Sequence, residues 1–496
     1  MGLSKNPSGI FSLVYSVRSL GTLGFVLVAA VSQLGCSFND LKPMSHLIPA
    51  EDLTVPLDSQ VKLSAANWPT ADWWRAFGDP QLNALVNKAL TNSPSMKAAA
   101  AKIRQAQAVE GIQAATLLPK VDGTLSSTRE RFSANGTTPP PVAGTWQWLN
   151  QGSINLSYEI DFWGKNEAAL QAAVGRTHAS EVEAQARSLA LATAVVSTYI
   201  NLKLNNDELD LENAALNNHL KVLDLTNKRF ASQLDSQVNV KQVEASIPAS
   251  RSRIAELREN QELIKTKLAT LTGEGASAGL NITSPKLKTP GTFGLPSQLT
   301  AELIGRRPDV VAQRWRVEAT GNDIREAKSR FYPNVSLTSF VGLQSLGFDV
   351  FANGSSRVLG VAPALSLPIF EGGRLRSNLA LQNANYDEAV ETYNQTILDA
   401  IKDISDQLTS LKWFSERYSQ QRLGVETATE AASLAEQRYS EGLASYIDVL
   451  YAQDQEISQQ RALAQLKARG LLLHAELSRA LGGGYSPFAT SETNTQ

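Results

Sequence analysis

Residues 438–453 read RYSEGLASYIDVLYAQ, and residues 229–244 read RFASQLDSQVNVKQVE. The two stretches share an arginine, an aromatic residue, a leucine, a serine and a valine at matching positions, at an offset of 209 residues (438 − 229). Gly442 suits the left-handed position that ends a helix, and Ser445 with Asp448 three residues later forms a capping box that begins another. Each stretch is therefore predicted to be a tight turn between two helices, so that the chain holds two duplicated helical hairpins.

The first of these turns lacks the glycine of the second. Gln233 stands at the position of Gly442, whereas Ser236 and Asn239 repeat the pattern of the capping residues. The first turn is therefore expected to resemble the second less closely at its helix end than at its helix start.

The helices around the turns repeat in the same way. Residues 94–118 and 308–331 are predicted helices, each followed by a proline. Residues 164–230 contain no proline and predict one helix of about 67 residues, about 100 Å long, and residues 372–439 predict another of similar length. After each turn a helix of about 36 residues returns, and Pro248 is expected to kink the first. Two short helices stacked end to end then match one long helix, as the wall of a tall cylinder requires.

Four stretches alternate apolar and polar residues, which is the pattern of half-buried strands. They are residues 120–131, 153–162, 335–343 and 359–369. Strands of about ten residues are long enough to cross a bilayer when tilted. The residues predicted to face lipid are Ile154, Leu156, Tyr158, Leu359, Leu365 and Leu367. The alternative is a soluble sheet that packs its apolar face on the helices.

Four strands cannot form a membrane barrel alone. An open sheet edge is not tolerated in lipid, and the smallest outer-membrane barrels have about eight strands. Several copies must therefore combine: two copies supply eight strands and three supply twelve. The predicted fold class is an α+β membrane protein, in which a long α-helical barrel is continued by a transmembrane β-barrel with four strands per chain, and the family resemblance given below implies closure as a trimer of twelve strands.

The N-terminus has the features of a bacterial secretory signal. An apolar run follows basic Lys5 and Arg18, and the sole cysteine, Cys36, comes directly after a small-residue site. Residues 1–35 are predicted to be removed, and Cys36 to carry lipid as in bacterial lipoproteins, although Gln33 stands where a leucine is usual. The alternative is an ordinary signal peptide followed by a free thiol.

Composition and motifs exclude several classes of function. The net charge of −2 provides no basic footprint for nucleic acid. The four histidines are scattered without metal-ligand spacing, and neither a phosphate-binding loop nor a Gly-x-Ser-x-Gly elbow is present. No enzyme activity and no cofactor are expected, so the energy for any transport must come from a partner.

These features together resemble the trimeric TolC-like outer-membrane factors, in particular the lipoprotein branch that serves resistance–nodulation–division pumps. The resemblance covers residues 37–482. It rests on both turn motifs, on Arg306-Arg307-Pro308-Asp309, on Pro119 and Pro333 before strands, and on Phe370-Glu371-Gly372-Gly373 after the last strand. It implies a passive exit duct in the outer membrane, a homotrimer, a periplasmic adaptor (membrane fusion) protein and an inner-membrane transporter as partners, and contact with outer-membrane lipid.

The expected organisation follows from the duplication. After the signal peptide come an N-terminal and equatorial segment (36–92), a first repeat (93–280), an equatorial linker (281–305), a second repeat (306–482) and a disordered tail (483–496). Trp68, Trp73 and Trp74 are expected to anchor the equatorial segment.

The turns carry the candidate functional residues. The expected adaptor contacts are Gln233, Leu234, Asp235, Gly442, Leu443 and Ala444. The resemblance also implies a gate, because Tyr439 and Asp448 match constriction positions of the family. Asn239 is the equivalent of Asp448 in the first copy, and Tyr451 stands where some relatives carry a second acid. The plainer alternatives are that Leu234 and Leu443 pack inside their own turns, and that Asp448 only caps its helix.

Two other functions remain open from the sequence. One is the periplasmic adaptor itself, which has a single helical hairpin on a β-rich body. The other is an outer-membrane channel that exports metal ions or, as in type I secretion, proteins. Three methionines and four histidines provide little support for a copper or silver channel.

Overall fold

The structure is a computed structural model of the 496-residue chain, and it describes residues 41–49, 64–65, 68–290, 294–295 and 305–486. Contacts divide the chain into two units. Among the described residues, the sheet unit takes 41–46, 105–177 and 315–391, and the helical unit takes 47–49, 64–65, 68–104, 178–290, 294–295, 305–314 and 392–486. Each unit thus draws on both halves of the duplicated sequence.

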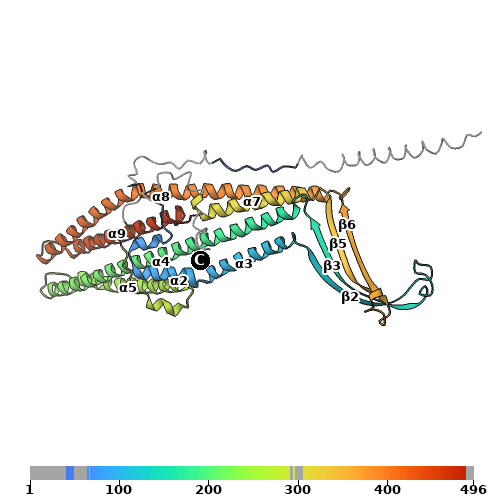
Figure 1. Cartoon of the computed structure of the whole chain (residues 1–496). Helices are drawn as coiled ribbons and strands as arrows, with labels where there is room; N and C mark the ends of the chain where they lie inside the picture. Colours follow the sequence, from blue (N-terminus) through green and yellow to red (C-terminus); the bar gives the residue numbers. More distant parts are fainter. Residues whose placement is uncertain (1–40, 50–63, 66–67, 291–293, 296–304, 487–496) are drawn as a thin grey trace, which may run out of the picture. The chain divides into compact units, whose positions relative to one another are not determined.

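Four strands form one antiparallel sheet in the sheet unit (Figure 1). They are β2 (Lys120–Arg131), β3 (Trp146–Ile160), β5 (Asn334–Leu346) and β6 (Arg357–Ser366), in the order β2-β3-β5-β6. Each half of the chain supplies one hairpin, and β3 pairs with β5 to join the halves. The prediction of two apolar-faced hairpins is therefore confirmed.

The strand limits differ from the prediction, most of all at the start of β3 and at the end of β6. β3 begins at Trp146, earlier than expected, because residues 146–148 pair with β2 and residues 149–152 pair with both β2 and β5. β6 ends at Ser366, so Leu367, which was expected to face lipid from a strand, lies beyond the sheet. The neighbouring strand β5 begins at Asn334, which pairs with Ser366, so Leu367 has no partner in β5 although the apolar alternation continues.

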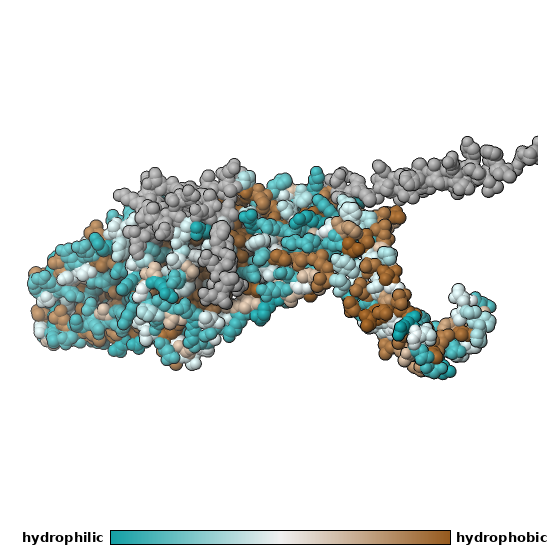
Figure 2. All heavy atoms as spheres, in the orientation of Figure 1, coloured by the Kyte–Doolittle hydropathy of each residue, from teal (hydrophilic) through white to brown (hydrophobic). Residues whose placement is uncertain are grey.

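The apolar face of the sheet is uncovered. The register places Leu156 opposite Val121 and Ser339, and Ile154 opposite Val341, which in turn pairs with Leu359. Leu359 is 77% exposed, and hydrophobic side chains gather over the strands (Figure 2). The alternative of a soluble sheet packed onto helices is therefore wrong.

Six helices repeat in three matched pairs. The short helices α3 (Pro94–Ala115) and α7 (Pro308–Ser329) have 22 residues each, the long helices α4 (Lys165–Ala231) and α8 (Arg374–Ser440) have 67 each, and the return helices α5 (Gln237–Leu271) and α9 (Tyr446–Ala480) have 35 each. α5 continues through Pro248. The duplication and the helix lengths predicted from the sequence are confirmed.

The remaining elements are short. They are β1 (Ser64–Ala65), which pairs in parallel with β4 (Gly294–Leu295), the helix α2 (Pro80–Asn92), and the 3₁₀ turns η2 (Trp73–Phe77), η3 (Ala276–Asn281) and η4 (Gly354–Ser356). Trp73 and Trp74 are buried with residues of α4 and α5 in the main core of the helical unit, as expected of anchoring residues.

In each half of the chain, a glycine follows the return helix at the place where that helix ends next to the start of a short helix. A Cβ on Gly273, after α5, would lie 2.8 Å from the carbonyl oxygen of Asn92, just before α3. A Cβ on Gly482, after α9, would lie 2.0 Å from the carbonyl oxygen of Arg306, just before α7. The two glycines are 209 residues apart (482 − 273), the same offset as the turns. The predicted end-to-end meeting of short helices is thus confirmed in both halves.

Arg307 fastens the second of these junctions. Its guanidinium is buried, forms ion pairs with Asp309 at 2.6 Å and Asp403 at 3.3 Å, and donates to the carbonyl oxygen of Ala480 at 3.3 Å. The RRPD motif is therefore a clamp between α7, α8 and α9. The following glycines, including Gly484, are closely packed, so the tail expected from residue 483 is ordered at its start, and residues 487–496 lie outside the described part.

Candidate functional site

The two turns between helices have the same backbone hydrogen bonds. Leu234 donates its N–H to the carbonyl oxygen of Arg229 at 2.8 Å, and Leu443 donates to that of Arg438 at 2.8 Å. Such a bond, spanning five residues, closes a helix when the residue before the donor is left-handed. Gln233 has a φ of 61° and Gly442 a φ of 79°. The first turn therefore forms without a glycine, and the backbone of Gln233 is strained in the left-handed conformation.

Replacing Gln233 with glycine is expected to raise the free energy of unfolding by about 0.5–1 kcal/mol. A left-handed φ costs a residue with a Cβ about 1–2 kcal/mol, and the larger freedom of glycine in the unfolded chain offsets part of that. Gly442→Gln is the matched variant and should lower the stability instead. Both are measured as shifts of the denaturant midpoint followed by circular dichroism. Shifts of the same sign for the two variants would contradict this account.

The helix starts after the turns are capped differently. In the second turn, the carboxylate of Asp448 accepts the N–H of Ser445 at 2.9 Å and its hydroxyl at 2.7 Å. These bonds from Ser445, the side chain first, lower the pKa of Asp448 below its ordinary value. In the first turn, Asn239 donates its N–H to the hydroxyl of Ser236 at 3.3 Å, but the N–H of Ser236 goes to Asp235 at 2.9 Å. Only one of the two hydrogen bonds of a capping box is therefore present in the first turn, because the side chain of Asn239 does not accept the N–H of Ser236.

Tyr439 ties the two hairpins together. Its side chain is 2% exposed, and its hydroxyl donates to the carboxylate of Asp235 at 2.7 Å and lies 3.0 Å from the hydroxyl of Thr226. The guanidinium of Arg229 lies 4.6 Å from the centre of its ring and donates to its carbonyl oxygen at 2.8 Å. Three residues of the first hairpin thus hold one tyrosine of the second, and we call this contact the tip lock.

Asp235 is the acceptor at the centre of the tip lock. Burial alone would raise its pKa, but the bond from Tyr439, followed by those from Asn239 and the N–H of Ser236, holds the pKa below its ordinary value. Burial and the bond to Asp235 raise the pKa of Tyr439. The stabilisation from an acid with a lowered pKa is complete above the unfolded value and is lost as the pH falls through the folded one. The tip lock is therefore intact from weakly acidic to weakly alkaline solution.

Most of the residues expected to contact an adaptor are on the surface. Leu234 and Leu443 are 67% and 65% exposed, so the alternative that they pack inside their own turns is wrong. Gln233 and Gly442 are exposed, and Ala444 is half-buried. Asp235 differs from the expectation, because its side chain is 5% exposed and is held in the tip lock.

Exposed apolar side chains surround the two turns. They are Phe230, Val238, Ile447 and Tyr451, in addition to Leu234 and Leu443. We call these six residues the apolar tip. Such a group of large exposed apolar side chains is typical of a surface that another protein covers.

The four expected gate residues are in different surroundings. Tyr439 is buried in the tip lock, and Asn239 joins it through Asp235, to which it donates at 2.5 Å. Asp448 is exposed on its cap, and Tyr451 is 69% exposed. Sequence reasoning missed Arg229 and Thr226 as partners of Tyr439. One signal was present, because Asp235 has no counterpart in the second turn, where Ala444 stands.

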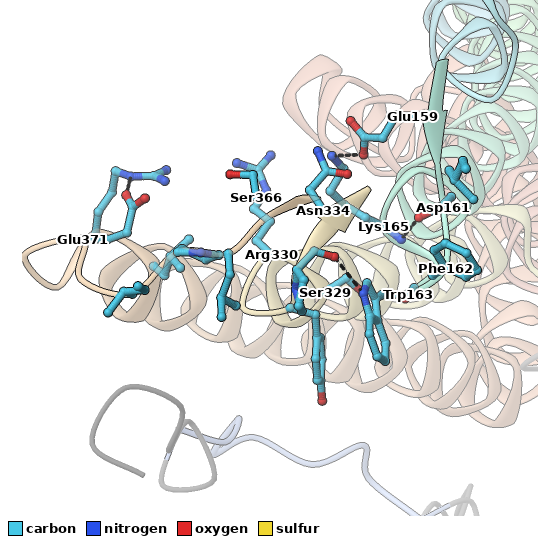
Figure 3. Close-up of a pocket in the computed structure, with 18 of the residues that line it drawn as sticks. Glu159, Asp161, Phe162, Trp163, Lys165, Ser329, Arg330, Asn334, Ser366 and Glu371 are labelled. Carbon is cyan, nitrogen blue, oxygen red and sulfur yellow. Dashed lines mark hydrogen bonds and ion pairs between the residues drawn. The ribbon is translucent and has the colours of Figure 1, made fainter. Parts of the chain in front are cut away.

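Apart from the turns, a hollow lies in the sheet unit, where the strands meet the helices (Figure 3). Its volume is about 790 Å³. Trp163 stacks on Tyr332 with 4.6 Å between ring centres and donates to the carbonyl oxygen of Pro333 at 2.8 Å. Glu159 forms an ion pair with Lys165. The ring contacts and ion pair brace the strand ends against the helix ends.

No group of three or more histidine, cysteine, aspartate or glutamate side chains in the described ranges could hold a metal ion. Within the same ranges, no helix is both long and apolar enough to cross a membrane.

Comparisons with known proteins agree with the geometry. The model of a family described as "Outer membrane efflux protein" matches residues 85–274 and 299–483. A fusaric acid resistance protein, FusA of Burkholderia cepacia, is 38% identical over 378 residues, covering 74% of this chain and 71% of that protein. The multidrug resistance outer membrane protein MdtP of Shigella flexneri is 30% identical over 465 residues, covering 91% and 94%. The crystal structure of the outer membrane protein VceC of Vibrio cholerae is similar with a TM-score of 0.79 and 34% identity, over 84% of this chain and 100% of that one.

Proposed function

The chain belongs to the outer membrane efflux protein family, and on this premise we propose that three copies close into the exit duct of a tripartite efflux system. The chain is an outer-membrane efflux channel for drugs or toxic compounds and not an enzyme. It is therefore not the periplasmic adaptor that its sequence left open. The observation that best supports the duct is the uncovered apolar sheet face with two free edge strands.

The free edges support closure by other copies. β2 and β6 are the edge strands of the four-stranded sheet, and lipid does not tolerate unpaired backbone groups. β6 of one copy pairs with β2 of the next in this proposal, and three copies give twelve strands. This number exceeds the minimum of about eight for an outer-membrane barrel.

The proposed partners follow from what a passive channel needs. An inner-membrane transporter of the resistance–nodulation–division class supplies the energy, and a periplasmic adaptor protein joins it to the channel. Small toxic organic compounds are the proposed substrates, in line with relatives named for resistance to fusaric acid and to multiple drugs. The apolar tip is the proposed adaptor-docking surface.

A negative charge in the apolar tip is expected to abolish efflux without affecting assembly. In Leu443→Asp the added carboxylate must lose its water when the adaptor covers it, which costs several kcal/mol. The measurement is the minimal inhibitory concentration of a panel of toxic compounds in a deletion strain that expresses the variant. Ser440→Asp, at an exposed polar position one turn earlier, is the control and should retain resistance.

The trimer yield of the same strains separates two causes. Equal yields of Leu443→Asp and wild type, together with lost resistance, support docking at the apolar tip. Loss of the trimer in Leu443→Asp would mean that the leucine serves the assembly of the channel, and full resistance would contradict the docking surface.

We further propose that the tip lock keeps the periplasmic opening of the channel closed. Asp235 holds Tyr439 and Asn239 in this contact. Asp448 and Tyr451 lie beside the opening in this proposal. Threefold symmetry would bring three Asp448 carboxylates around one axis. The hydrogen bonds from Ser445, the side chain first, lower the pKa of Asp448 within one chain and so oppose the rise in pKa that mutual repulsion of the three carboxylates would cause. Such a ring attracts cations, so the constriction is expected to be sensitive to multivalent cations from the periplasmic side.

The N-terminal segment supports lipid anchoring. Cys36 lies outside the described residues, but Leu41 packs against a cluster at the ends of α7 and α8 that includes Phe331 and Leu375. Leu375 also lines the hollow at the strand ends. Leu41 is five residue steps after Cys36, and five steps span at most about 17 Å. An acyl chain on Cys36 is therefore within reach of the region where the strands begin.

Cys36→Ser is expected to remove lipid labelling and to leave channel assembly intact. A single acyl chain provides only marginal membrane binding, whereas the barrel is itself inserted in the membrane. The measurement is incorporation of a fatty-acid analogue into wild type and variant in growing cells. Equal labelling of the two proteins would contradict lipidation at Cys36.

A further inference from the structure

The apolar face of the sheet has a defined outer border. On β3 it runs from Gly152 to Ile160, and eight residue steps correspond to about 27 Å along the strand. With the tilt of about 35–45° found in such barrels, this projects to about 20 Å, close to the apolar band of an outer-membrane barrel. Arg357 pairs with Leu343, which pairs with Gly152, so Arg357 stands in the border row at the hairpin end.

A hollow lies beside Arg357. It has a volume of about 600 Å³. Apolar residues and glycines of β2, β3 and β5 line it together with two hydroxyl residues and one cation of β6; they are Gly123, Thr124, Leu125, Gly152, Ser153, Ile154, Val341, Gly342, Leu343 and Arg357. A Cβ on Gly123 would meet nothing within 4 Å. The missing side chain of Gly123 thus leaves a depression in an apolar face, open toward the surroundings and wide enough for a hydrocarbon chain.

Arg357 is the cation of this hollow, and it is exposed. In the described part of the chain no hydrogen bond or ion pair engages its guanidinium, and this includes Asp349, the acid of the β5–β6 connection. The guanidinium thus has its donors available at the end of an apolar groove. That arrangement fits a phosphate with an attached hydrocarbon chain, because a guanidinium donates two parallel bonds to phosphate oxygens.

Two further arginines lie on the same face, four and six residues beyond the border row toward the hairpin end. Arg129 pairs with Trp148, and Arg131 pairs with Trp146, and the Arg129 guanidinium lies 6.0 Å from the centre of the Trp148 ring. Both arginines are exposed on β2. In the closed barrel β2 lies beside β6 of the neighbouring copy, so the strand with Arg357 and the strand with Arg129 and Arg131 become neighbours.

We propose that this border is a binding site for a diphosphorylated glycolipid of the outer leaflet, with an acyl chain in the hollow and a phosphate on Arg357. Two features favour this lipid over a phospholipid. The hairpin ends face outward in an outer-membrane channel, where the outer leaflet carries glycolipid, and the arginines of two adjoining copies match two phosphates rather than one. The orientation rests on the family assignment, and the second feature rests on the proposed closure.

The test uses the purified full-length channel in detergent and native mass spectrometry. The probes are diphosphoryl lipid A, monophosphoryl lipid A and phosphatidylglycerol at equal concentrations. Wild type is expected to retain diphosphoryl lipid A at least about fivefold better than the other two, since the charge-assisted bonds to the second phosphate are absent from them. Equal retention of phosphatidylglycerol would overturn the assignment to glycolipid.

Variants locate the site. Arg357→Gln should reduce retention of diphosphoryl lipid A about fivefold or more, and Arg357→Lys should keep most of it, because the positive charge remains. Gly123→Leu fills the hollow without a clash and should also reduce retention. Lys120→Gln, which removes a charge from the other face and the other end of β2, is the control and should bind as wild type does. Retention in Arg357→Gln equal to that in wild type would overturn the proposal, and so would a loss of the same size in Lys120→Gln.

Discussion

Arginine at position 156 is expected to prevent the chain from assembling in the outer membrane. Leu156 lies on the apolar face of β3, between Val121 of β2 and Ser339 of β5, and near the middle of the apolar band. An arginine facing lipid near the bilayer middle costs about 2–4 kcal/mol. Three copies would therefore lose about 6–12 kcal/mol, which is comparable to the whole stability of an ordinary folded domain.

The matched control is the neighbouring residue on the other face. Asn155 lies directly opposite Asp122, so Asn155→Arg introduces the same side chain beside an acid and toward the polar side of the sheet. The measurement is the amount of heat-modifiable trimer in outer-membrane fractions. We expect it to be lost in Leu156→Arg and retained in Asn155→Arg. The reverse result would mean that the polar face is the one that meets lipid.

The regular parts of this fold could be predicted from the sequence because they depend on local patterns. A period of two residues fixes which face of a strand is apolar, and absence of proline with a fixed repeat offset fixes the helix lengths. The predicted strand limit was wrong where the alternation of apolar and polar residues continued beyond the end of the strand. Leu367 continued the alternation of β6, but the strand had already ended, because its partner β5 begins at Asn334, opposite Ser366.

The tip lock could not be predicted, because it joins residues that are 204 apart in the sequence. Sequence reasoning placed Asp235 on a docking surface, since a turn residue is usually exposed. In the structure, the same carboxylate lies between two hairpins and accepts three hydrogen bonds. The difference between Asp235 and Ala444 marked the site, but only the packing of one hairpin on the other identified Tyr439 as its partner.

Removing the carboxylate of Asp235 is expected to open the channel. Hydrogen bonds to a charged group contribute about 1.5–3 kcal/mol each, and the guanidinium of Arg229, 3.5 Å away, loses its counter-charge as well. A loss of about 3 kcal/mol shifts an equilibrium between closed and open tips by about 100-fold. In planar bilayers Asp235→Ala should therefore show a several-fold larger mean conductance than wild type. Unchanged conductance would contradict the proposal that the tip lock keeps the opening closed.

A double-mutant cycle tests whether the bond itself is responsible. Tyr439→Phe removes only the hydroxyl that donates to Asp235 and contacts Thr226. If that bond holds the tip closed, the double variant should open little further than Asp235→Ala, with a coupling energy of about 1.5–3 kcal/mol between the two sites. Additive effects would mean that the two residues act on the conductance separately.

Asp448 provides the comparison that separates a lock from a charged ring. Its carboxylate caps its own helix through Ser445 and is not part of the tip lock. Asp448→Asn keeps a capping side chain and removes the charge, so a charged ring predicts larger conductance and loss of block by multivalent cations. If Asp448→Asn behaves as wild type while Asp235→Ala opens, the closed state is held by the contact between hairpins within each copy, and Asp448 is a cap. If both variants open and only Asp448→Asn loses the cation block, lock and ring act together, with Asp235 setting the position of the helices and Asp448 the charge between them.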